Sequence, residues 1–195
     1  MSKRFTPAEL KTLHNTKFFE LKAIATKKID ALLADVRDAL KTEIEKNNLK
    51  FPKEVDASTG KIFRGENYLS LPYLVLDYPK YFSKDSVFAF RTMFWWGNFF
   101  SFTLHLQGKA LEERRKILIK KIPDFKKKDI YICVNQDPWQ YHYKKDNYLP
   151  IDKFSDAELK KIFQEKEFLK LSAKLPIKEH KKLNTFCKES FRIFQ

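Results

Sequence analysis

Histidine and cysteine are the side chains best suited to hold a metal or to act as nucleophiles, but the sequence does not group them. They stand at His14, His105, His142, His180, Cys133 and Cys187. No CxxC pair or HExxH motif brings two of them to the spacing that zinc sites use, so we expect no bound metal. A nucleophilic triad that joins one cysteine to a histidine is an alternative that no local pattern supports.

Phosphate-binding loops are also missing. The chain has only 4 glycines, and neither GxGxxG nor GxxxxGK[ST] occurs. Loops that bind phosphate through backbone N–H groups need glycine, because the backbone must approach the phosphate closely. We therefore expect no nucleotide cofactor, and no other cofactor is indicated. The GxSxG motif of serine hydrolases is absent as well.

One group of polar and aromatic residues is a candidate site for a small molecule. Its members are Arg91, Trp96, Thr103 and His105. Small polar groups among aromatic rings are typical of ligand pockets. An arginine in the middle of an apolar strand needs an acidic partner or a bound anion, and Asp77 or Glu66 is a suitable acid. A purely structural role, with Arg91 ion-paired and the hydroxyls bonded locally, is the alternative.

A second group, in the C-terminal half, mixes rings with cations. Its members are Arg114, Arg115, Lys120, Lys121, Trp139, Tyr141, Lys144 and Lys145. Stacking faces interleaved with positive charge suit single-stranded nucleic acid. The alternative is an edge strand whose lysine-bearing tip prevents aggregation.

The charge balance favours an anionic partner, nucleic acid first. The net charge is +14, and residues 109–195 alone contribute +9 with 22 Lys/Arg against 13 Asp/Glu. However, 32 of the 39 cations are lysine, whereas arginine is better suited to forked phosphate contacts. A solvated lysine-rich surface is therefore the competing interpretation.

The aromatic segment 86–108 predicts a β-hairpin that turns at Gly97-Asn98. A two-residue loop pairs Trp96 with Phe99, Trp95 with Phe100 and Phe90 with His105. Because side chains alternate, this register places Arg91 on one face and Thr103 with His105 on the other. Both faces are then largely apolar, and we expect helices to cover both, with one open binding face as the alternative.

The remaining elements predict an α+β fold, in which N-terminal and C-terminal helices cover an antiparallel sheet centred on the 86–108 hairpin. Capping boxes at Thr6/Glu9 and Ser155/Glu158 indicate two helix starts. Short strands are expected at 61–64, 73–77, 130–134 and 139–143, with turns at 65–67 and at Pro79. Phe168, Leu169 and Leu171 are assigned to the apolar face of a helix. We expect a single domain, 1–195, with N-terminal helices 6–48, sheet core 60–107 and 130–143, basic helix 109–122 and C-terminal helices 155–195.

The chain shows no apolar signal core at its start and no window long enough to span a bilayer. We therefore expect a soluble cytoplasmic protein with no membrane partner and with reduced cysteines, one disulfide being the alternative.

The composition resembles that of small bacterial proteins, and it decides neither the function nor whether the protein is an enzyme. The alternatives are a polyanion or single-stranded nucleic-acid binding module, a small-molecule binder or enzyme using the hairpin face, and a homodimer formed through an exposed aromatic patch.

Overall fold

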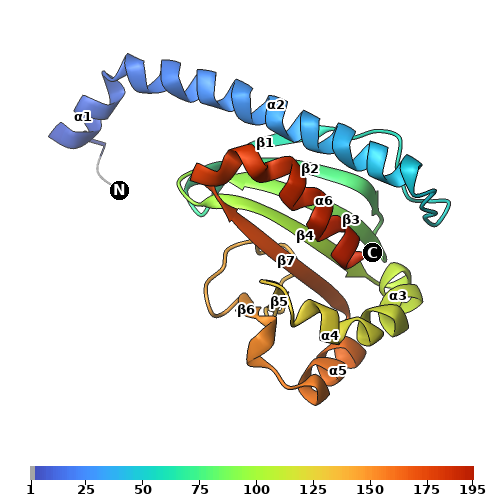
Figure 1. The fold of residues 1–195 in the computed structure, drawn as a ribbon. Coiled ribbons are helices and arrows are strands. Elements are labelled where there is room, and N and C mark those ends of the chain that lie inside the picture. The colour runs from blue at the N-terminus through green and yellow to red at the C-terminus, as the bar shows by residue number, and fades with distance from the viewer. Residues whose placement is uncertain (1–2) are drawn as a thin grey trace.

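A seven-stranded antiparallel sheet with helices against one face forms the centre of the molecule (Figure 1). The computed structural model describes residues 3–195, so residues 1 and 2 of the expected domain lie outside it. The strand order is β1-β2-β3-β4-β7-β5-β6. The strands are β1 Ile62–Tyr68, β2 Leu71–Phe82, β3 Val87–Trp95, β4 Phe99–Gln107, β5 Tyr131–Cys133, β6 Tyr148–Pro150 and β7 Phe168–Pro176. The predicted α+β fold, with its sheet centred on the β3–β4 hairpin, is confirmed.

The helices are α1 Pro7–Leu13, α2 Thr16–Lys46, α3 Lys109–Lys120, α4 Ile122–Phe125, α5 Asp156–Glu165 and α6 Leu183–Phe194, with 3₁₀ turns η1 Ile151–Lys153 and η2 Ile177–Lys182. Helices α1, α3 and α5 begin within one or two residues of the predicted starts, whereas α4 was not predicted and α6 begins only at Leu183. Both predicted capping boxes are confirmed. At α1 the Thr6 hydroxyl accepts from Glu9 N, and at α5 the Ser155 hydroxyl accepts from Glu158 N. Each box satisfies backbone donors that the first helical turn leaves unpaired.

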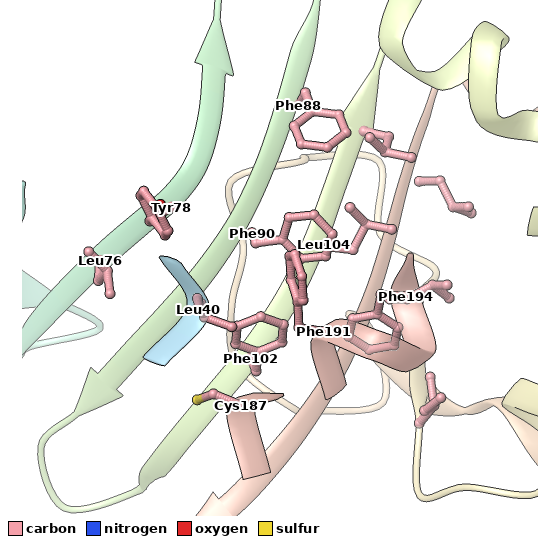
Figure 2. Close-up of a cluster of buried hydrophobic side chains, with 14 of the residues drawn as sticks. Leu40, Leu76, Tyr78, Phe88, Phe90, Phe102, Leu104, Cys187, Phe191 and Phe194 are labelled. Atoms are coloured by element: carbon pink, nitrogen blue, oxygen red, sulfur yellow. The ribbon is translucent and has the colours of Figure 1, made fainter. Parts of the chain in front are cut away.

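The hydrophobic core lies between the helices and one face of the sheet (Figure 2). Residues spaced three or four apart along α2 are buried there, among them Val36 and Leu40. Rings from β3, β4 and α6, including Phe90, Phe102 and Phe191, are fully buried beside them. Burying one such ring stabilises the fold by about 2–3 kcal/mol. This face therefore supplies most of the apolar burial and leaves the opposite face free for polar groups.

The predicted hairpin register is wrong by one residue. Trp95 pairs with Phe99, Arg91 with Thr103 and Ala89 with His105, so the expected pairs Trp96–Phe99, Trp95–Phe100 and Phe90–His105 do not form. A two-residue type I′ turn needs positive φ at both central residues, but only Gly97, at 71°, has it. Trp96, Gly97 and Asn98 therefore form a three-residue loop closed by Asn98 N donating to Trp95 O over 3.0 Å. The change moves every β4 side chain to the other face.

The C-terminal region contains a central strand, which corrects the prediction of helices throughout 155–195. After α5 ends at Glu165, β7 pairs along its whole length with β4 and partly with β5. Its apolar residues Leu169 and Leu171 face the helices, and Lys170 and Ser172 face the other way. The edge of β4 offers backbone N–H and C=O groups, and the segment pairs with them as a strand. A helix would bond its own backbone groups internally. The sheet core thus includes 168–176 and is not limited to 60–107 and 130–143.

The predicted strand 139–143 is instead part of a long loop, residues 134–147, which we call the covering loop. Asparagine and aspartate side chains shape it: Asn135 Oδ1 accepts from Asp137 N and Asp137 Oδ1 from Trp139 N, each over 2.8 Å. Such Asx turns compete with strand pairing, and the partner of β5 is β6. The covering loop lies over the sheet face opposite the helices, which corrects the expectation of helices on both faces.

Two further boundaries differ from those expected. β1 continues through Gly65 to Tyr68, and the turn lies at Leu69 and Ser70, which adopt positive φ of 50° and 66°. β2 continues past Pro79 to Phe82 through a bulge between Asp77 and Lys80. A bulge lets the strand accommodate a proline, which has no N–H to offer the ladder.

Candidate functional site

A row of polar side chains crosses the sheet on the face opposite the helices, which we call the second face. Register places Asp77 of β2 beside Arg91 of β3, Arg91 beside Thr103 of β4, and Thr103 beside Ser172 of β7. Asp77, Thr103 and Ser172 are buried, at 4%, 1% and 0% exposed. Buried polar groups need partners, so the row must be held by specific contacts.

The strongest of these contacts is the ion pair between Arg91 and Asp77. Arg91 Nε donates to Asp77 Oδ1 over 2.7 Å and Nη2 donates to Oδ2 over 2.8 Å, which is a bidentate geometry. Burial lowers the pKa of Arg91, but the hydrogen bonds that it donates to Asp77 and the electrostatic interactions with Asp77, Tyr141 and Tyr148 together raise it by more, so the guanidinium stays charged. The prediction of Asp77 as a partner for Arg91 is confirmed, whereas Glu66 pairs with Lys22.

Hydroxyl groups continue the row. Thr103 Oγ1 lies 2.6 Å from Ser172 Oγ, and Tyr143 Oη lies 2.5 Å from the same oxygen. Burial raises the pKa of Tyr143 above its usual range, so this phenol stays protonated and can donate. The three hydroxyls satisfy one another without any charged group.

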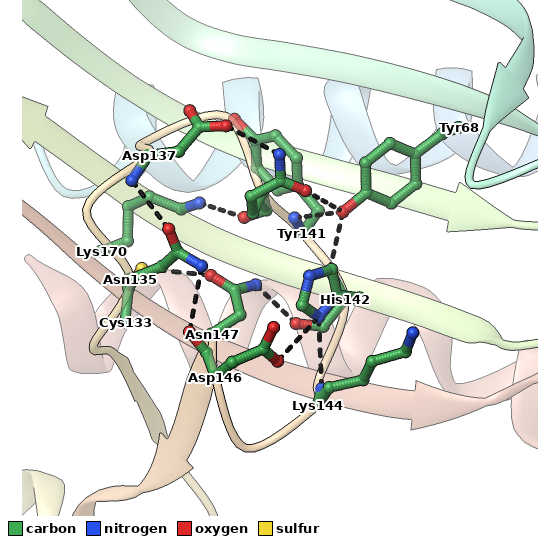
Figure 3. A network of polar contacts seen from close by, with 11 residues as sticks. Tyr68, Cys133, Asn135, Asp137, Tyr141, His142, Lys144, Asp146, Asn147 and Lys170 are labelled. Atoms are coloured by element: carbon green, nitrogen blue, oxygen red, sulfur yellow. Dashed lines mark hydrogen bonds and ion pairs between the residues drawn. The ribbon is translucent and has the colours of Figure 1, made fainter.

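Lys170 of β7 fastens the covering loop to the second face (Figure 3). Its Nζ donates to Pro138 O over 2.8 Å and to Gln140 O, and the residue is fully buried. Burial, helped by repulsion from Arg91, lowers the pKa of Lys170 to about 7, and no carboxylate in residues 3–195 forms an ion pair with it. This lysine therefore changes charge near neutrality.

Tyr68 of β1 fastens the other side of the covering loop. Tyr141 N and His142 N donate to Tyr68 Oη over 2.6 and 3.0 Å (Figure 3). Within the loop, Asn147 Nδ2 donates to His142 O over 2.5 Å. These bonds give the loop a defined position although it has no regular secondary structure.

Tyr141 lies between the two cations of the second face. Its ring centroid is 4.7 Å from Arg91 Cζ and 4.1 Å from Lys170 Nζ. Its hydroxyl is buried and has no hydrogen bond to any residue in the described part of the chain. Burial raises the pKa of this phenol, so the unpartnered group is a neutral donor.

A small cavity opens beside these residues. Its volume is about 230 Å³, and it is lined by Tyr68, Tyr73, Val75, Arg91, Met93, Trp139 and Tyr141. Trp139 is 47% exposed and forms part of the rim. Two nitrogens of the Arg91 guanidinium bind Asp77, and the third, Nη1, makes no hydrogen bond with residues 3–195. The cavity thus offers a cation and several aromatic walls, which we call the Arg91 pocket.

His105 lies next to this pocket and beneath Trp139. The two ring centroids are 5.3 Å apart, and Phe168 packs against His105 from another side. Burial, with repulsion from Lys170 and Arg91, lowers the pKa of His105 well below its usual value, so the imidazole is neutral. Its Nε2 is buried without a hydrogen-bond partner in the described residues.

The structure brings three of the four predicted ligand residues to one face. Arg91, Thr103 and His105 share the second face because of the corrected register. Trp96 lies on the helix side, where its ring packs against Phe94. Lys170 and Ser172 were missed because their segment was assigned to a helix. The alternation of Lys170, Ser172 and Lys174 with apolar neighbours is the signal that indicates a strand with one polar face.

The structure places the predicted nucleic-acid group differently. Arg114 Nη2 donates to Gln195 O over 3.1 Å, and Arg115 donates to Phe163 O, Lys166 O and Glu112, so both arginines are used within the fold. Tyr141 is buried against Arg91. Exposed positions remain at Lys120, Trp139, Lys144 and Lys145, whereas Lys121 is half-buried.

The cysteines do not provide a reactive thiol. Cys133 and Cys187 are both free and buried. Burial raises both thiol pKa values, and Cys133 Sγ donates to Asn147 Oδ1 over 3.4 Å. A protonated thiol is a poor nucleophile and a poor metal ligand. Within residues 3–195 there is also no group of three metal-ligating side chains.

A larger cavity, of about 510 Å³, lies beside α6 and contacts Lys128, Asp129 and Lys174. None of the four predicted ligand residues lines it, and its charged groups stand at the surface. The Arg91 pocket combines buried charge with unpartnered polar atoms, and we therefore take it as the candidate site.

None of the helices in residues 3–195 combines the length and the apolar character needed to cross a lipid bilayer. Comparison of the chain with protein-family models, with curated proteins and with solved structures finds no match.

Proposed function

We propose that the protein binds a small organic anion in the Arg91 pocket. The observation that carries this proposal is that Arg91, whose Nη1 makes no hydrogen bond with the described residues, lines a cavity walled by aromatic rings. A carboxylate that accepts from Nη1 would gain a charge-assisted hydrogen bond in a site where little water competes. The rings of Tyr68, Tyr73 and Trp139 would contact an apolar or aromatic body.

The size and charge of the pocket limit the ligand class. A volume of about 230 Å³ suits a small molecule, not a chain of nucleotides. The Arg91–Asp77 pair is formally neutral, but Lys170 behind the Tyr141 ring adds a positive charge when it is protonated. The local balance thus favours a monoanion.

The unpartnered atoms support the same proposal. Tyr141 lines the pocket, and its Oη is buried without a partner in the described chain; His105 Nε2, beside the pocket and not on its wall, is also without a partner there. Leaving a polar group unpaired costs about 1–3 kcal/mol, and a ligand that reaches such a group recovers part of that cost.

The polyanion alternative rests on the net charge of +14 and on exposed lysines. Its two arginine candidates are hydrogen-bonded within the protein, which removes the residues best suited to phosphate. It therefore ranks second, and an oligonucleotide titration in low salt tests it directly.

A calorimetric titration with matched probes tests the anion proposal. Benzoate carries the proposed carboxylate, and benzamide is its neutral isostere. We expect benzoate to bind at least about tenfold more tightly than benzamide. Trp139→Ala should weaken benzoate binding, whereas Trp96→Ala, on the opposite face, should not.

Three results would contradict the proposal. The first is no binding by benzoate or by a panel of small aliphatic carboxylates. The second is equal binding of benzoate and benzamide, which would remove the role of charge. The third is equal sensitivity of binding to Trp139→Ala and Trp96→Ala, which would place the ligand elsewhere.

A further inference from the structure

An apolar groove lies where α2 leaves the sheet, on the helix side and away from the Arg91 pocket. Its volume is about 290 Å³. Three elements line it: α2 with Ala25 and Leu32, the β3–β4 hairpin end with Trp96 and Phe100, and η2 with Ile177 and His180. Ile177 is 37% exposed, so the groove is open to a partner from outside.

The apolar surface continues from this groove along α2. The first turns of α2 extend past the end of the sheet, as Figure 1 shows. Leu21 lies four residues before Ala25 on the groove wall, and Phe18 lies three residues before Leu21; they are 56% and 50% exposed. Exposed apolar residues that form a continuous surface mark interaction sites on soluble domains.

The two segments that flank the groove are rich in lysine. Residues 16–28 of α2 and residues 177–182 of η2 together contain seven lysines and two glutamates. Lys182 is paired with Glu179 over 2.8 Å and Lys22 with Glu66 over 2.6 Å, and the other five lysines have no ion pair within the described residues. Lys28 and His180 stand directly on the rim. An apolar groove flanked by lysine-rich segments is complementary to a helix with one apolar face and acidic flanks.

We propose that this groove and the adjoining α2 surface bind an acidic amphipathic helix of another protein. Because the groove is concave, it fits the row of side chains on a helix better than a flat lipid surface. The positive charge of the flanking segments disfavours the same basic surface on a second copy of the chain. The proposal is independent of the anion proposed for the Arg91 pocket.

Fluorescence anisotropy with a labelled synthetic helix tests the proposal. The probe is an amidated peptide of about 18 residues, with leucines spaced three and four apart and glutamates elsewhere. The control peptide has lysine in place of glutamate. The full chain is used as wild type and with Ala25→Glu or Ile177→Glu in the groove. Ile117→Glu, at an exposed isoleucine of α3, is the matched control, and circular dichroism checks that each variant is folded.

We expect saturable binding of the acidic peptide, at least about tenfold tighter than that of the lysine peptide. Each groove substitution should weaken it about tenfold or more, and Ile117→Glu should leave it unchanged. Equal binding of the two peptides, or equal loss with Ile117→Glu, would overturn the proposal. Two further results would count against it. One is that the protein binds anionic phosphatidylserine vesicles but not the peptide. The other is that the wild-type protein self-associates and the groove substitutions abolish this self-association.

Discussion

The ring of Tyr141 lies 4.7 Å from the Arg91 guanidinium, and the Arg91–Asp77 pair beneath it is bidentate. This contact connects the covering loop to the polar row of the sheet. Because Tyr141 also contacts Lys170 on β7, one side chain separates two buried cations. Positive charge therefore lies next to the cavity, and the Asp77 carboxylate neutralises only part of it.

The hydroxyl of Tyr141 has no partner in residues 3–195, so Tyr141→Phe should stabilise the unliganded protein. Removing an unsatisfied buried group should raise the free energy of unfolding by about 1 kcal/mol. If the hydroxyl contacts the ligand, the same variant should bind benzoate less tightly. Urea denaturation and calorimetry measure the two effects, and a destabilised Tyr141→Phe would show that the hydroxyl has a structural partner.

Removal of Arg91 should destabilise the protein more than removal of the whole pair. Arg91→Leu leaves the 5% exposed carboxylate of Asp77 without its counter-ion, which should cost about 3–5 kcal/mol. The double variant Arg91→Leu, Asp77→Leu should recover part of that loss, because no buried charge remains. Urea melts of the two variants give the comparison; equal losses would mean that Asp77 finds another partner or water.

Lys170 should make stability rise with pH above neutrality. Burial lowers its folded-state pKa from 10.5 to about 7, so the unfolded chain binds the extra proton between these values. The free energy of unfolding should therefore increase by up to about 1.4 kcal/mol per pH unit from about pH 7 to 9. Lys170→Met should remove this slope. A wild-type profile that is flat or falling over the same window would show that Lys170 stays protonated.

The same titration should affect ligand binding in the opposite direction. Below about pH 7 the protonated Lys170 adds a positive charge behind Tyr141, and this charge attracts an anion. Benzoate affinity should fall about two- to fivefold from about pH 6 to 8. Calorimetry on Lys170→Met, which has no titrating amine, should show a smaller change, and an affinity that rises with pH would contradict the model of the site.

Gly65 should be required for the position of Tyr73 on the pocket wall. A Cβ at Gly65 would lie 2.4 Å from the Tyr73 ring, whereas at Gly60 it would meet the flexible side chain of Arg37. Gly65→Ala should therefore weaken benzoate binding by displacing the ring, and Gly60→Ala is the matched control. Binding that is unchanged in Gly65→Ala would mean that Tyr73 does not contact the ligand.

The sequence by itself determined the features that depend on local interactions. The capping boxes at Thr6 and Ser155 satisfy backbone donors within one turn, so their residues predict the helix starts directly. The apolar spacing along α2 and the turn residues after Trp95 likewise predict a long helix and a hairpin. Arg91 was recognisable as a candidate because a charge inside an apolar strand needs a partner wherever the strand lies.

Tertiary structure alone decided which side chains meet. One loop residue, Trp96, decides whether Thr103 and His105 share a face with Arg91, because a strand has a side-chain period of two. The alternation around Lys170 is compatible with a strand, but which strands it joins, β4 and β5, depends on segments distant in the chain. The Arg91 pocket therefore depends on contacts between residues distant in the chain, whose geometry local patterns do not encode.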